Sequence, residues 1–369
     1  MKSTLTIIRW FVGTLFIFSG LVKANDPLGL SYKMQEFFEA WGVQGFHHYT
    51  LALAVLMNAF EIIAGIALIV GWRMKLFSWL LLLLIVFFTF LTGYAWLATN
   101  PDGSPKFSGC GCFGDCLPLV PFQSFLKDIL LLVLITVIIF FRKYIQPLFR
   151  SNKLNLIFIG LSFFFSFGFQ WYTLTYLPVV DCLPFKKGNN ILEMRKVPAN
   201  AVPDKFDYVF TYEKNGKQQQ FSMKNLPDST WKFVERKQIL LAKGKNNEAK
   251  IKDFDLKTEA GMDITEDVLQ QLGTYYLLYV RSTDGLKPTD TWIQQASLLA
   301  TKNKVIIITS VPDAAKALFA TNASLSQSIF LSCDVTAIKT AARANPVLYK
   351  MEGAVVLDKW SSADFKHIK

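Results

Sequence analysis

The chain has 369 residues and a formal net charge of +11, and its composition is 52% hydrophobic with 33 Phe. One soluble core would not accommodate so apolar a composition, so we expect two parts of different character. The positive charge is scattered along the chain and forms no arginine-rich stripe interleaved with aromatic residues. Nucleic-acid binding is therefore not expected.

Five long apolar segments precede Pro178, and none follows it. Each is long enough, at about 1.5 Å per residue, to cross roughly 30 Å of hydrocarbon. The segments are residues 4–22, 49–72, 76–98, 122–141 and 154–177. The first lacks a small-residue cleavage site and four more spans follow it, which favours a retained anchor over a signal peptide. We predict a multi-pass membrane protein in contact with membrane lipid.

The basic residues beside these spans differ between the two sides of the membrane. One side carries Lys2, Arg9, Arg73, Lys75, Arg142, Lys143, Arg150 and Lys153, and the short loops of the other carry only Lys23, Lys33 and Lys106. Because positive flanks stay in the cytoplasm, the N-terminus is predicted to be cytoplasmic and residues 178–369 extracytoplasmic. All five cysteines then lie where disulfides form and persist.

The connector at residues 25–48 begins with a turn signal, Asp26-Pro27, and a helix is expected from Ser31. Its aromatic residues would suit the membrane surface, with Glu36 and Glu39 toward water. A simple packed connector is the alternative interpretation. The aromatic residues are Phe37, Phe38 and Trp41.

Polar residues also occur inside the spans. Glu61 and Asn58 lie well within the second one, and a lone carboxylate there costs a few kcal/mol unless it is paired or lines a polar cavity. The available counter-charges are Lys23 and, near the outer end of the fourth span, Lys127 beside Asp128. Two interpretations of Glu61 remain: a structural ion pair that fixes helix register, or a functional site for a proton or a ligand.

Residues 99–121, between the third and fourth spans, are rich in Gly, Pro and Cys. Cys110 and Cys112 are two residues apart and could form a strained, easily reduced disulfide, or pair in turn with Cys116 in a relay of thiol exchange. The alternative is a structural disulfide that holds the loop, and Cys182 follows the fifth span closely enough to reach it.

No metal site is expected from these cysteines. Zinc normally takes four nitrogen or sulfur ligands, and only His47 and His48 lie on the same side of the membrane part. Cys333 ends a predicted strand, and such a cysteine is more often packed in a core than nucleophilic.

Beyond the spans, residues 178–205 carry four prolines and are expected to be a linker. Residues 206–213 and 218–223 alternate polar and apolar side chains around Asn215-Gly216, which predicts a β-hairpin. Strands and helices alternate past Gly273, which argues for an α/β layer fold. The expected strands are 276–281, 304–309, 328–333, 347–351 and 354–358, and the expected helices are 289–302, 312–321 and 336–343.

Residues 275–360 resemble a thioredoxin-like domain, through the first two of these strands, Ala344 to Leu348 and the hairpin at Met351 to Ala354. The resemblance implies that Pro346 follows a cis peptide bond. Catalytic members carry Cys-x-x-Cys after the first strand, whereas this chain has no cysteine at Ser282 to Lys287. The domain should therefore lack the thiolate attack that those enzymes perform.

Residues 5–141 resemble the DoxX and MauE group of small four-helix membrane proteins. The resemblance is carried by Arg9 to Gly20 with Lys23, Asp26-Pro27, Glu61 with Gly65 and Gly71, Cys110 to Gly114, and Lys127-Asp128. It implies the cytoplasmic membrane of a bacterium and a role in maturing disulfide-containing periplasmic enzymes. In related DoxD-type chains it implies electron transfer to quinone.

The expected architecture is thus an all-α membrane bundle followed by an extracytoplasmic α/β domain. The expected parts are a four-helix domain at 1–150, a fifth span at 151–178, a linker with a β-hairpin extension at 179–273 and a thioredoxin-like domain at 274–369. Our leading hypothesis is a membrane redox or maturation factor that exchanges disulfides through Cys110, Cys112 and Cys116 and passes electrons to quinone. The alternative is a non-catalytic subunit or scaffold whose soluble domain binds a periplasmic protein.

The basic flanks make the topology testable. A reporter fused after Lys369 should be active only outside the cytoplasm, and one inserted at Met74 only inside it, because the flanks alternate strictly. Activity of paired alkaline phosphatase and fluorescent protein fusions measures both positions. A C-terminal reporter active only in the cytoplasm would contradict the orientation.

Overall fold

The computed structural model describes residues 2–101, 103–107, 109–149, 151–242 and 244–368, so Arg150 of the basic flanks lies outside the described residues. Within this part, five helices are long and apolar enough to cross a membrane, as predicted. They are α1 (Lys2–Asn25), α3 (Thr50–Val70), α4 (Met74–Leu97), α5 (Pro121–Phe141) and α6 (Asn152–Thr175). Short 3-10 turns, η1 (Gln44–Tyr49) and η2 (Arg142–Tyr144), adjoin α3 and α5.

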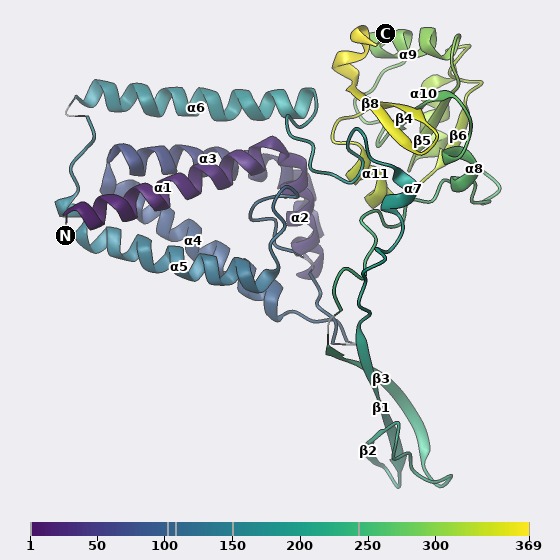
Figure 1. The fold of residues 1–369 in the computed structure, drawn as a ribbon, viewed down its shortest axis with the longest axis horizontal. Coiled ribbons are helices and arrows are strands. Elements are labelled where there is room, and N and C mark those ends of the chain that lie inside the picture. The colour runs from purple at the N-terminus through teal and green to yellow at the C-terminus, as the bar shows by residue number, and fades with distance from the viewer. Residues whose placement is uncertain (1, 102, 108, 150, 243, 369) are drawn as a thin grey trace.

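Helices α1, α3, α4 and α5 share one apolar core, and α6 lies beside α3 at the edge of the bundle (Figure 1). The glycines of α1 permit its close contact with α3, since a Cβ at Gly13 would lie 2.9 Å from the Gly65 carbonyl oxygen. Helix α6 is joined to the bundle by polar contacts. Gln170 accepts a hydrogen bond of 3.1 Å from Asn58.

Helix α2 (Pro27–Ala40) crosses the end of the bundle (Figure 1). The predicted start at Ser31 is wrong, because Asp26 caps the helix by accepting a 3.0 Å hydrogen bond from the Gly29 N–H, and Pro27 occupies the first turn. Phe37 is buried and stacks on Phe107 with ring centroids 4.6 Å apart. Of the two interpretations, the packed connector therefore describes this part of the helix.

The soluble part contains a five-stranded sheet of order β6-β5-β4-β7-β8. Strands β4, β5 and β6 are parallel, and β7 and β8 are antiparallel to their neighbours. The strands are β4 (Thr274–Val280), β5 (Val305–Thr309), β6 (Ile329–Ser332), β7 (Val347–Glu352) and β8 (Val355–Ser361), with helices α9 (Thr291–Ala300), α10 (Pro312–Phe319), α11 (Val335–Ala341) and η3 (Ser362–His367). Each predicted strand and helix of this region is present, and the Asn345-Pro346 bond is cis, as expected.

The segment expected to be a linker contributes to the core of this sheet. Phe185 and Ile191, the latter in α7 (Ile191–Met194), are buried with Tyr279 of β4. Phe254 and Leu269, the latter in α8 (Thr265–Leu269), join the same cluster. The domain of the five-stranded sheet therefore includes segments before residue 202 and after residue 245. The described residues between them extend away from it.

Residues 205–242 form a separate three-stranded antiparallel sheet, the arm, of order β2-β1-β3. Its strands are β1 (Lys205–Lys214), β2 (Lys217–Ser222) and β3 (Lys232–Ala242). The hairpin turn at Asn215-Gly216 is confirmed. Strand β3 was not predicted, because three consecutive charged residues, Glu235 to Lys237, interrupt its alternation. Figure 1 shows the arm extending away from both the bundle and the five-stranded sheet.

Candidate functional site

The cysteine loop between α4 and α5 folds against the end of the bundle. Cys116 forms a disulfide with Cys182, which joins the loop to the segment after α6. Cys110 and Cys112 are partly buried free thiols. Cys333 is also free and is buried in the core of the five-stranded sheet, where it was expected to be packed. The structure thus separates the three loop cysteines into one that holds the loop and two that carry free thiols.

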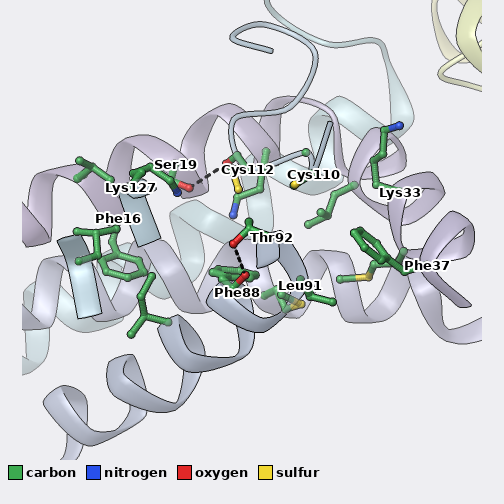
Figure 2. A pocket seen from close by; sticks show the side chains of 18 residues that line it. Phe16, Ser19, Lys33, Phe37, Phe88, Leu91, Thr92, Cys110, Cys112 and Lys127 are labelled. Atoms are coloured by element: carbon green, nitrogen blue, oxygen red, sulfur yellow. Dashed lines mark hydrogen bonds between the residues drawn. The ribbon is translucent and has the colours of Figure 1, made fainter. Parts of the chain in front are cut away.

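Both free thiols line a cavity enclosed by α1, α2, α4, α5 and the loop (Figure 2). Its walls are mainly apolar, and its volume is about 40 Å³, compared with the roughly 10 to 15 Å³ that one water needs. In Figure 2 the thiols lie between Phe16 and Phe37, which are toward opposite ends of the cavity. The polar side chains of the wall are Ser19, Lys23, Lys33, Thr92 and Lys127.

Two of these lysines are paired with buried carboxylates. Lys23 forms the ion pair predicted for Glu61, and both side chains are almost fully buried. The Lys127 ammonium lies 2.8 Å from one carboxylate oxygen of Asp128, and the other oxygen accepts a 3.0 Å hydrogen bond from the Thr92 hydroxyl. Asn58 does not join these pairs, since its amide donates to α6. Each buried carboxylate therefore has its own cation, and both cations face the thiol cavity.

Burial dominates the protonation of the thiols. It raises the pKa of Cys110 to about 12, and the neighbouring Cys112 and Asp128 raise it too, while Lys33 and Lys127 oppose them. Burial also raises the pKa of Cys112, against the effect of Lys127. Both groups are therefore protonated near neutral pH, and because the thiolate is the reactive form, each must lose a proton before it reacts as a nucleophile.

The side chain of Lys33 packs against Gly111, the residue between the two cysteines. Gly111 has a positive φ of 71°, and a Cβ there would lie 3.3 Å from the Lys33 Cγ. The ammonium of Lys33 donates to both carboxylate oxygens of Glu36 at 2.9 Å. Lys33 lines the thiol cavity and also an open hollow of about 670 Å³ that reaches the soluble domain. Lys33 was not predicted to belong to the site, and the only signal for it in the sequence is the i,i+3 spacing from Glu36.

The soluble domain meets the membrane part through Arg343. This buried guanidinium donates to Asp26 at 2.7 Å and to Asp115 of the cysteine loop at 2.9 Å. Arg281, at the end of β4, donates to the Tyr32 hydroxyl of α2 at 2.6 Å. Arg343 and Asp115 were not predicted to meet, since no sequence pattern links residues so far apart.

Pro346 lies beside this contact. Its neighbour Asn345 accepts a 2.9 Å hydrogen bond from the Arg281 N–H and donates a 2.7 Å bond to the Ser282 carbonyl. Arg281 in turn reaches Tyr32 of α2. The loop without cysteines at residues 282–287 and Pro346 are therefore held next to the face through which the soluble domain contacts α2.

Two segments of the chain match known families. Residues 1–141 match the family of methylamine utilisation protein MauE. Residues 206–243, which include most of the arm, match a domain of unknown function (DUF8463). No curated protein and no solved structure matches the chain. Residues 1–141 are thus similar to the MauE family, and this match includes Cys110, Cys112 and both lysine pairs.

The Lys23–Glu61 pair yields a prediction about stability. Glu61→Gln leaves a buried ammonium without its counter-charge and should lower the free energy of unfolding by about 3 to 5 kcal/mol. Denaturant titration of the purified protein in detergent measures this. Glu39→Gln, on an exposed side chain, should change little, and Lys23→Met combined with Glu61→Gln should recover much of the loss. A Glu61→Gln protein as stable as the parent would contradict the pairing.

The raised thiol pKa yields a prediction about reactivity. The rate of Cys110 alkylation by iodoacetamide should rise about tenfold per pH unit from pH 7 to 10 without levelling, because the thiolate fraction keeps growing below a raised pKa. Peptide mass spectrometry measures the rate. Free cysteine in the same tube should level off above about pH 8.5. A plateau for Cys110 at that pH would show a thiol of ordinary acidity.

Proposed function

We propose that this MauE-like chain is a redox factor of the bacterial cytoplasmic membrane that introduces disulfides into an extracytoplasmic client protein. The observation that carries the proposal is the pair of free thiols, Cys110 and Cys112, in the wall of an apolar cavity among membrane helices. The family description further suggests an accessory role in methylamine utilisation. In this proposal the N-terminus is cytoplasmic and the soluble domain extracytoplasmic, as the basic flanks favour.

The proposed reaction has two steps. Joining the Cys110 and Cys112 thiols as a disulfide releases two electrons and two protons. A client thiolate then attacks one sulfur of that disulfide, and the client's second thiolate resolves the mixed disulfide, which leaves the client oxidised and both loop thiols reduced. Because only Gly111 separates the two cysteines, their disulfide is strained and transfers readily to a client.

The wall of the cavity suits a membrane quinone as the electron acceptor. A bound quinone supplies the oxidising capacity by taking up two electrons and two protons. Phe16, Phe88 and Leu91 offer apolar contact, and Lys127 offers a hydrogen-bond donor for a ring oxygen. The volume of about 40 Å³ is small for a ring, so binding requires side chains such as Met34 to move, which an unbranched thioether does readily.

The lysines beside the thiols favour proton loss there. Lys127 lowers the pKa of Cys112, against burial, and therefore stabilises the thiolate over the thiol. The carboxylate of Asp128 lies within the same buried network. We assign the Lys127–Asp128 pair the role of holding charge balance while the thiol protons leave. Lys33 controls the route from the open hollow, through which a client cysteine reaches the loop.

A second candidate function is a non-catalytic scaffold. It is favoured by the Cys116–Cys182 disulfide and by the Arg343 contacts, which hold the loop and the soluble domain in place. The lack of Cys-x-x-Cys in the soluble domain also favours it. In that case the soluble domain binds a periplasmic partner, and the free thiols have no exchange role.

Trapping experiments distinguish the two functions. If Cys110 and Cys112 exchange disulfides, the exchange also runs in reverse: in Cys110→Ser or Cys112→Ser the remaining loop thiolate attacks the disulfide of an oxidised client. No second loop thiol is left to release it, so a mixed disulfide with the client should accumulate. Non-reducing electrophoresis of proteins from acid-quenched cells detects the adduct. Cys116→Ser opens only the loop disulfide and should destabilise the loop without trapping the client at that position.

The control is the Cys110→Ser, Cys112→Ser double variant, which cannot form the adduct. A trapped client in either single variant, absent from the double variant, supports the exchange function. If no single variant yields an adduct and the double variant fully restores function in cells that lack the protein, the exchange function is wrong. The scaffold function would then be the better proposal.

A further inference from the structure

The two faces of the arm differ sharply in chemistry. Residues paired across antiparallel strands share a face, and faces alternate along each strand. The register of β1 with β2 and β3 therefore places one group of rings together. This aromatic face comprises Phe206, Tyr208, Phe210, Tyr212, Phe221 and Phe233. The Tyr212 ring lies 5.8 Å from Phe221 and 5.7 Å from Phe233, between centroids.

The carboxylates of the strands are confined to the face opposite the aromatic one, and that opposite face also carries Lys232 and Lys237. Lys214, Lys217 and Arg236 lie on the aromatic face by register. Arg236 is 5.1 Å from the Tyr208 ring centroid, and Lys214 is 5.8 Å from that of Trp231, which packs on Phe221. The acidic residues of the three strands, Asp207, Glu213 and Glu235, lie on the opposite face. The aromatic face thus presents rings and cations together, without a carboxylate from these strands.

This face is not covered by a second layer of the described chain. Phe233 is 52% exposed, the other five rings of the face are partly buried, and the arm is a single sheet of three strands. A sheet of this size usually gains its stability by packing a hydrophobic face against something else. An exposed aromatic face with basic residues therefore indicates a partner that is apolar at depth and anionic at its surface.

The position of the arm identifies that partner. Its strand β3 lies against the turn that follows α4, where a Cβ at Gly103 would be 3.7 Å from the Leu240 nitrogen. The arm thus begins where a membrane helix ends. In Figure 1 it runs from there across the direction of the helices and beyond the outline of the bundle.

We propose that the aromatic face of the arm lies on the headgroups of anionic lipids, on the membrane surface at the outer ends of α4 and α5. Tyr, Trp and Phe rings settle at the boundary between hydrocarbon and headgroups, where one side is apolar and the other wet. Lys214, Lys217 and Arg236 add attraction to negative headgroups. The arm then anchors the soluble domain along the membrane, and this role is independent of the proposed redox function.

Hydrogen exchange of the full chain tests the proposal. The protein is placed in nanodiscs of phosphatidylcholine alone or with roughly a third phosphatidylglycerol. Amides of β1, β2 and β3 should exchange more slowly in the anionic discs by about fivefold or more, the effect of one basic side chain at such a surface. Peptides from β4 serve as the internal reference and should not differ. High salt should remove the difference in the unaltered protein, because it screens the surface charge.

A charge-reversed variant and a matched control complete the test. Combined Lys214→Glu, Lys217→Glu and Arg236→Glu should abolish the difference between the discs. Combined Lys287→Glu, Lys302→Glu and Lys366→Glu, at exposed lysines of the five-stranded sheet domain, should retain it. Equal exchange of the arm in the two discs, or a difference that persists in high salt, would overturn the proposal and leave the aromatic face to a protein partner.

Discussion

One guanidinium, that of Arg343, joins α2, the cysteine loop and the domain of the five-stranded sheet. It bonds Asp26, which caps α2, and Asp115, which lies in the cysteine loop, and it also donates to the backbone of α11 at Lys339. Burying this charge is costly, and two carboxylates with good geometry offset that cost. The position of the loop relative to α2, and hence the cavity between them, depends on this contact.

Buried charges inside the bundle are likewise paired with a charge of opposite sign. Lys23 is matched by Glu61 and Lys127 by Asp128, so neither ammonium is left alone in a medium of low dielectric constant. The thiols beside them are less acidic than usual, because burial raises their pKa by more than the neighbouring cations lower it. The two thiols are therefore weak nucleophiles in the reduced state, because little of either is present as thiolate.

The elements fixed by local pattern could be predicted from the sequence, and those fixed by distant contacts could not. Apolar length identified the five spans, and the cost of an unpaired carboxylate identified Lys23 as a candidate partner of Glu61. The start of α2 was missed because Asp26-Pro27 was interpreted as a turn alone, although the pair is also a helix cap. The burial of Phe185 and the Arg343 bridge depend on surfaces that only the folded chain brings together.

The Cys116–Cys182 disulfide has a consequence for how the chain is assembled. The two cysteines are 66 residues apart, and the whole of α5 and α6 lies between them. The covalent ring therefore contains both helices and can close only after each has been inserted and its ends have met the loop. The presence of this bond therefore indicates that both helices have been inserted. Once closed, it also keeps α6, which only borders the bundle, from drifting away in the plane of the bilayer.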